Sequence, residues 1–65
     1  MAKVVRRVDG GPGANFVVLE TDSTGTAVLV VAASAYVPGR PTDEYDPADL
    51  VQLDLDTLEE VHDEP

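Results

Sequence analysis

The chain has 65 residues, no cysteine and a formal net charge of −9. It forms one domain at most, and a chain of this size buries only about 60% of its unfolded surface. Disulfides and thiolate metal sites are excluded, so oligomerisation or a partner is the remaining means of stabilising so small a core.

Residues 3–8 alternate loosely between valine and basic side chains. Their β-branched content favours a strand, and their charges are typical of an edge strand. The glycines and proline of residues 9–13 (DGGPG) then break regular structure. They match neither phosphate-binding glycine pattern, so we expect a hairpin loop.

Residues 15–21 (NFVVLET) form the next expected strand, and residues 22–25 (DSTG) a compact turn. An antiparallel hairpin between residues 15–21 and 26–35 follows from this order. Strict alternation places three side chains of the first strand on one face: Phe16, Val18 and Glu20.

The most apolar stretch is residues 26–37 (TAVLVVAASAYV), in which residues 27–33 carry no polar side chain. It is too short to cross a bilayer as a helix, which needs about 20 apolar residues. The run is typical of a strand that is buried on both faces. One face can be covered by side chains such as Phe16 and Leu53, whereas the other needs closure of a barrel or a second chain.

Residues 38–47 contain three prolines, which exclude a continuous helix or a central strand. We expect a loop or an extended arm. Asp46 and Pro47 fit the start of one helical turn through Leu50, with Asp46 as the N-cap.

Residues 51–61 allow two structures. Apolar and polar residues alternate from Val51 to Asp56, which favours a half-buried strand with an acidic outer face, followed by a turn and a last short strand. The spacing of Val51, Leu55 and Leu58 also fits a helix that continues from the Asp46 cap.

These elements predict an all-β or mainly β fold: a small antiparallel sheet or SH3-like barrel of four to five short strands, with a short helical turn near 46–50 or 57–62. The expected parts of this single domain are a β-rich core (1–37), a proline-rich arm (38–47), an acidic C-terminal segment (48–62) and a tail (63–65).

No residue pattern indicates catalysis. The single imidazole, His62, lies in the acidic tail, and no spacing relates it to Ser23 or Ser34. Asp54 and Asp56 match the first positions of a calcium-binding EF-hand loop, but the glycine and the final glutamate of that loop are missing. We expect no enzyme, no cofactor and no metal site.

The charges divide at Arg40. Residues 1–40 have a net charge of +1, whereas residues 41–65 carry ten acidic residues and no basic one. This division favours a basic partner, pairing of the two parts between subunits, or a solvated acidic face. The few basic residues near the N-terminus are not enough for direct nucleic-acid binding.

The sequence therefore favours a non-catalytic, small acidic protein that binds other proteins or copies of itself. The first hypothesis is an accessory or structural subunit of a larger assembly, such as a phage capsid- or tail-associated component. The residue usage is typical of a GC-rich genome, such as that of an actinobacterium or one of its phages. The alternative is an acidic DNA mimic that inhibits a basic host DNA-binding protein. The candidate partner-binding residues are Leu29, Val31, Tyr36, Tyr45, Asp54, Asp56, Glu59 and Glu60.

Met1 to Val8 is charged, and the apolar region of a signal peptide does not follow it. We expect no membrane contact, and a location in the cytoplasm or in a particle assembled inside the cell, such as a virion.

Overall fold

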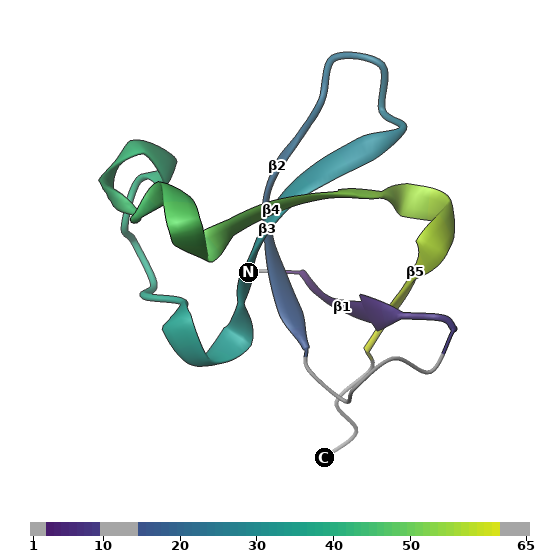
Figure 1. Cartoon of the computed structure of the whole chain (residues 1–65), viewed down its shortest axis with the longest axis horizontal. Helices are drawn as coiled ribbons and strands as arrows, with labels where there is room; N and C mark the ends of the chain where they lie inside the picture. Colours follow the sequence, from purple (N-terminus) through teal and green to yellow (C-terminus); the bar gives the residue numbers. More distant parts are fainter. Residues whose placement is uncertain (1–2, 10–14, 62–65) are drawn as a thin grey trace.

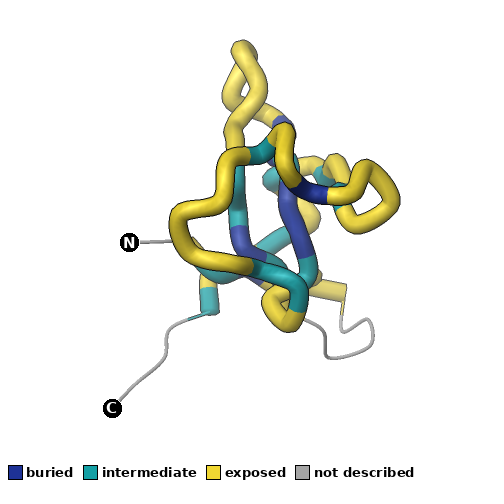
Figure 2. The backbone as a smooth tube through the Cα atoms, turned by 90° about the vertical axis from the view of Figure 1, so that its left-hand side faces the viewer, coloured by how far each residue is buried: buried dark blue, intermediate teal, exposed yellow. Residues whose placement is uncertain are grey.

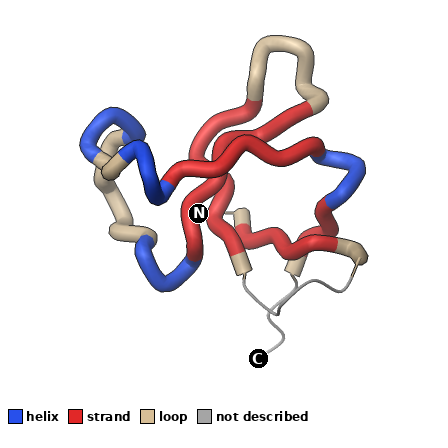
Figure 3. The backbone as a smooth tube through the Cα atoms, viewed as in Figure 1, coloured by secondary structure: helices blue, strands red, loops and turns tan. Residues whose placement is uncertain are grey.

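Five short strands form one antiparallel sheet in a computed structural model that describes residues 3–9 and 15–61 (Figure 1). The order across the sheet is β4-β3-β2-β1-β5. The strands are β1 (Val4–Arg7), β2 (Phe16–Thr21), β3 (Ala27–Ala32), β4 (Leu50–Asp54) and β5 (Leu58–Glu60). The helical elements of the described residues are all 3-10 turns, namely η1 (Ala33–Ala35), η2 (Thr42–Glu44), η3 (Pro47–Asp49) and η4 (Leu55–Thr57) (Figure 3). The predicted mainly β fold is confirmed.

The C-terminal segment is a strand, a turn and a second strand, so the strand prediction is confirmed and the helical alternative is wrong. β4 pairs with β3, whereas β5 pairs with β1 at the other end of the sheet. The 3-10 turn η4 joins β4 to β5, so the sheet curls round until its two end strands are consecutive in the chain (Figure 1). The described strands thus form the small antiparallel sheet of the prediction, with five strands.

β1 lies inside the sheet, so the expectation of an edge strand is wrong. It pairs with β2 on one side and with β5 on the other. Arg6 stands directly opposite Glu59 of β5 and Arg7 opposite Leu58, so these basic residues do not protect an open edge. Residues 10–13 of the expected hairpin loop and the expected tail, residues 63–65, lie outside the described residues.

The expected hairpin is confirmed as β2 and β3, joined by a turn in which Gly25 has a φ of 75°. Its register shifts between Val18 and Glu20, because Val18 pairs with Val30 whereas Glu20 pairs with Leu29. Leu19 and Glu20 therefore both stand opposite Leu29, which is a β-bulge. The bulge removes Glu20 from the face of Phe16 and Val18, so that part of the alternation was wrong.

The inner face of the curled sheet encloses the first of two apolar clusters. Val5, Val28 and Val30 are buried at its centre. Half-buried residues from the other strands and from η4 pack around them: Phe16, Val18, Leu53, Leu55 and Leu58. This face of β3 is covered as the sequence predicted.

The outer face of β3 is covered by the same chain. Val17 and Val31 pack there against Tyr45, which comes from the segment between β3 and β4 and is only 5% exposed. Figure 2 shows the buried positions in the interior of the fold, with exposed turns and loops around them. The Tyr45 hydroxyl accepts a hydrogen bond from the Val37 N–H at 3.0 Å and lies 3.1 Å from the Val37 carbonyl, to which it donates. Residues 33–49, called the arm below, therefore cover the face of β3 for which the sequence predicted barrel closure or a second chain.

We expect the attachment of the arm to depend on the hydrogen bonds of the Tyr45 hydroxyl to Val37. Tyr45→Phe keeps the ring but leaves the Val37 groups without this partner, so we expect a loss of about 1 kcal/mol in the free energy of unfolding. Tyr45→Ala also removes the buried ring, and we expect a loss of about 3–5 kcal/mol. Both are measured by urea unfolding followed by circular dichroism.

Tyr36→Phe is the matched control, because Tyr36 is half-buried in the same cluster and its hydroxyl holds no hydrogen bond to the described residues. It should leave stability almost unchanged. Equal effects of Tyr36→Phe and Tyr45→Phe would contradict the role assigned to the hydroxyl.

Candidate protein-binding surface

A groove lies between the arm and the outer face of the sheet. Its apolar lining comes from prolines of the arm, from Tyr45 and from the start of β4, and carboxylates stand beside it. Glu20 also lines a neighbouring hollow with Leu29 and Gln52, so the two hollows share this residue. The two hollows together are called the outer groove, and its lining includes Glu20, Pro41, Asp43, Pro47, Leu50 and Gln52.

The acidic character of the outer groove has a local cause in β2. Without the bulge, Glu20 would point toward Phe16 and Val18 in the inner cluster. The extra residue turns it to the outer face, where its carboxylate is exposed. Asp43 reaches the same groove from the turn η2. Neither carboxylate holds a salt bridge to the described residues.

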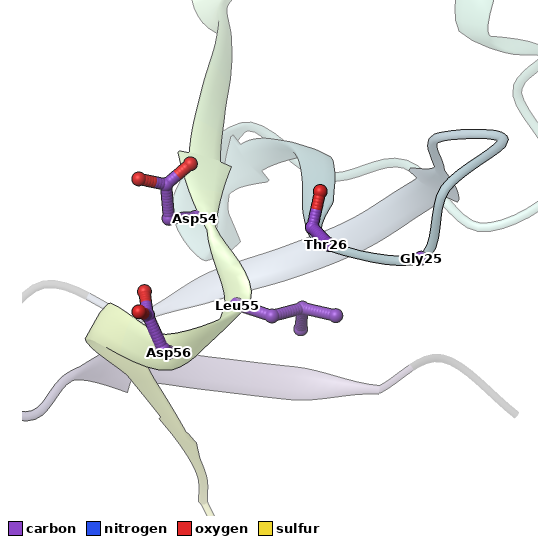
Figure 4. Close-up of a pocket in the computed structure, with 5 residues that line it drawn as sticks. All are labelled: Gly25, Thr26, Asp54, Leu55 and Asp56. Atoms are coloured by element: carbon purple, nitrogen blue, oxygen red, sulfur yellow. The ribbon is translucent and has the colours of Figure 1, made fainter.

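Asp54 and Asp56 lie together at the far end of β4. With Gly25, Thr26 and Leu55 they line a second hollow, and Figure 4 shows both carboxylates on the same side of the chain. The strand ends at Asp54, and Asp56 belongs to η4, so the 3-10 turn rather than strand alternation brings the two side by side. Leu55 points away from them and packs in the inner cluster.

Glu59 and Glu60 have partners within the chain. Glu59 lies 2.7 Å from the Arg6 guanidinium, and Glu60 lies 3.3 Å from the Lys3 ammonium. All four side chains are about half exposed, so each pair contributes little to stability. At these positions the basic and acidic parts of the sequence pair inside one chain, whereas pairing between subunits stays a prediction.

The apolar candidate residues are less exposed to solvent than a partner-binding role requires. Val31 has no exposed surface and Tyr45 is buried with it. Leu29 and Tyr36 are half-buried on the same outer face. Of the candidate residues, Asp54 and Asp56 are thus the exposed ones without an ion pair, and Glu20 and Asp43 join them as residues that sequence reasoning missed.

The turn between β2 and β3 holds Asp22 in a set of hydrogen bonds. Its carboxylate accepts from the Thr24 hydroxyl at 3.0 Å and from the Thr26 N–H at 3.1 Å. Partial desolvation acts to raise the pKa of Asp22, but these bonds, with the N–H groups of Ala27 and Gly25, outweigh it and hold the pKa below its ordinary value.

The described residues contain no group of three or more acidic or histidine side chains that could hold a metal ion. Ser23 precedes β3 and Ser34 follows it, so the two hydroxyls lie at opposite ends of that strand, and His62 is outside the described residues. Within the described part of the chain, no helix has the length and apolar character needed to cross a membrane.

Comparisons of the chain with protein-family models, curated proteins and solved structures find no match.

Asp22 should give a stability difference that depends on pH. Its folded-state pKa is lowered, so its contribution is fully present above the ordinary pKa and is lost as pH falls through the lowered one. We expect Asp22→Asn to unfold at lower urea than the parent at neutral pH, with the difference disappearing on acidification. Asp43→Asn, at an exposed carboxylate with no hydrogen bond to the described residues, is the control and should show no such trend. A difference for Asp22→Asn that stays constant with pH would contradict the prediction.

Proposed function

We propose that this chain is a non-catalytic protein-interaction protein, an accessory subunit that attaches to a basic surface of a larger assembly. The observation that carries the proposal is the set of exposed carboxylates along the outer groove and the end of β4, without ion pairs to the described residues: Glu20, Asp43, Asp54 and Asp56.

The apolar residues favour this acidic surface over an apolar interface. Both faces of β3 are covered within the chain, by the curled sheet and by the arm. The large apolar side chains that are exposed in the described residues come from three separate segments, namely Val8, Val37 and Val51. Scattered residues of this kind are normal on a protein surface. A partner is therefore expected to recognise charge first.

The basic residues support the same conclusion. Lys3 and Arg6 are engaged by Glu60 and Glu59. Arg40 lies 5.3 Å from the centre of the Tyr45 ring, in cation–π distance. The acidic side chains along β4 and the arm consequently have few cations of their own chain to neutralise them, and a basic partner gains both affinity and association rate from them.

A DNA-mimicking inhibitor is the second candidate, and the same unpaired carboxylates favour it. A protein that holds DNA offers a basic surface, which exposed carboxylates on a small rigid domain can occupy. The two candidates differ in one measurable property, because a mimic competes with DNA for its partner whereas an accessory subunit does not.

The proposal is tested by capturing partners from the source organism at low and at high salt, with identification by mass spectrometry. Three double variants are compared: Glu20→Gln with Asp43→Asn, Asp54→Asn with Asp56→Asn, and Glu59→Gln with Glu60→Gln. All three change the net charge by the same amount. We expect the first two to weaken binding of the captured partner at least about tenfold at low salt, and the third to weaken it far less.

Added duplex DNA then separates the candidates, since its competition with the chain supports the mimic and its indifference supports the accessory subunit. Equal binding by all three double variants, or binding that salt leaves unchanged, would overturn both.

A further inference from the structure

β4 is an end strand of the sheet and offers an open hydrogen-bonding edge. It pairs with β3 along its whole length, and no other described strand pairs with it. Figure 3 shows it running across the molecule from the arm to η4. Unpaired N–H and C=O groups along such an edge can receive a further strand.

The register identifies which groups point outward. The Leu55 N–H donates to the Thr26 carbonyl at 2.9 Å, and hydrogen-bonded pairs alternate along an antiparallel ladder. Leu53 and Val51 are therefore bonded to β3, whereas the N–H and C=O of Gln52 point away from it.

The two ends of this edge are closed by the chain itself. The Leu50 N–H bonds to the Pro47 carbonyl, and the Asp54 carbonyl accepts from the Thr57 hydroxyl at 2.7 Å. Gln52 is left at the centre, with exposed side chains before and after it: Val51 is 37% exposed, and Asp54 is also exposed. The opening thus has a defined position.

The edge lacks the usual protection against strand addition. Leu50–Asp54 contains no proline and no lysine, and its register with β3 is unbroken. β5, at the other end of the sheet, is a poorer template because it has only three residues. Its two glutamates are ion-paired, Glu59 with Arg6 of β1 and Glu60 with Lys3, which precedes β1. A strand is therefore expected to add at β4.

The charges around β4 decide the occupant. Asp49 stands before the strand, and Asp54 and Asp56 stand at its end. A second copy, paired antiparallel about Gln52, would bring Asp49 of each chain toward the Asp54 end of the other, and facing like charges destabilise a sheet. A segment with lysine or arginine at alternate positions meets the same carboxylates with opposite charge.

We propose that the β4 edge binds a basic, extended segment of a partner protein as a sixth strand. Its backbone bonds to the N–H and C=O of Gln52, and its basic side chains lie beside Asp49, Asp54 and Asp56. This mode of recognition takes affinity from the main chain and selectivity from the alternate side chains. It rests on the proposed function, for which it supplies the partner's conformation.

Two substitutions at one position test the edge. Gln52→Pro removes the outward N–H, and proline is tolerated on an edge strand when its nitrogen faces solvent. Gln52→Ala removes the same side chain and keeps the N–H, so it is the matched control. Both leave the charge unchanged, and amide NMR spectra verify that both remain folded.

The probe is a synthetic peptide of alternating lysine and valine. The control is the same peptide N-methylated at every second residue, which keeps the lysine charges but cannot form backbone hydrogen bonds with β4. We expect the unmethylated peptide to slow hydrogen exchange at the Gln52 amide, and to bind Gln52→Pro about tenfold more weakly than Gln52→Ala. The methylated peptide should bind the parent chain weakly.

Equal binding of the two variants, or of the two peptides, overturns strand addition. If the carboxylate variants still weaken partner binding in that case, the proposed function stands without it. If Gln52→Pro weakens binding and the carboxylate variants do not, the acidic surface is the part that fails.

Discussion

The fold depends on the burial of β3 on both of its faces. Val30 and Val31 are successive residues on opposite faces, and neither has any exposed surface. Each face of such a strand must be covered by other apolar side chains, and in a chain of 65 residues this uses most of the large apolar residues of the described part. The curled sheet supplies the inner cover and the arm supplies the outer one. Because both come from the same chain, what remains for a partner is mostly polar and acidic.

The arm links stability to the candidate surface through Tyr45. Its buried ring completes the outer cluster, and its hydroxyl fixes the chain at Val37. The same attachment places Pro41, Asp43 and Pro47 beside the sheet, where they form a wall of the outer groove. A substitution that frees the arm would therefore weaken the core and disperse the groove together, so binding measurements on such variants need a parallel measurement of folding.

Local patterns in the sequence predicted the hairpin, the Asp46 cap and a strand from Val51, which the structure begins one residue earlier, because each depends on neighbouring residues. The Asp46 carboxylate indeed accepts from the Ala48 N–H at 3.0 Å. The features that were missed depend on distant contacts. The internal place of β1 is set by β5, about fifty residues later, and the bulge before Glu20 by its register with β3. The burial of Tyr45 also depends on distant residues, because its cluster contains Val17 and Val31 from other parts of the chain.

The division of charge along the sequence becomes a division across the fold. At the β1 and β5 end, two acidic residues are neutralised by basic residues that lie far from them in sequence. At the other end of the sheet, β4 and the arm carry carboxylates that form no ion pair with the described residues. Gln52, whose backbone groups are open, lies on the side that carries these carboxylates, so a basic chain attracted by charge would meet available hydrogen bonds there. Charge would then govern the encounter, and the backbone edge would determine how long the complex lasts.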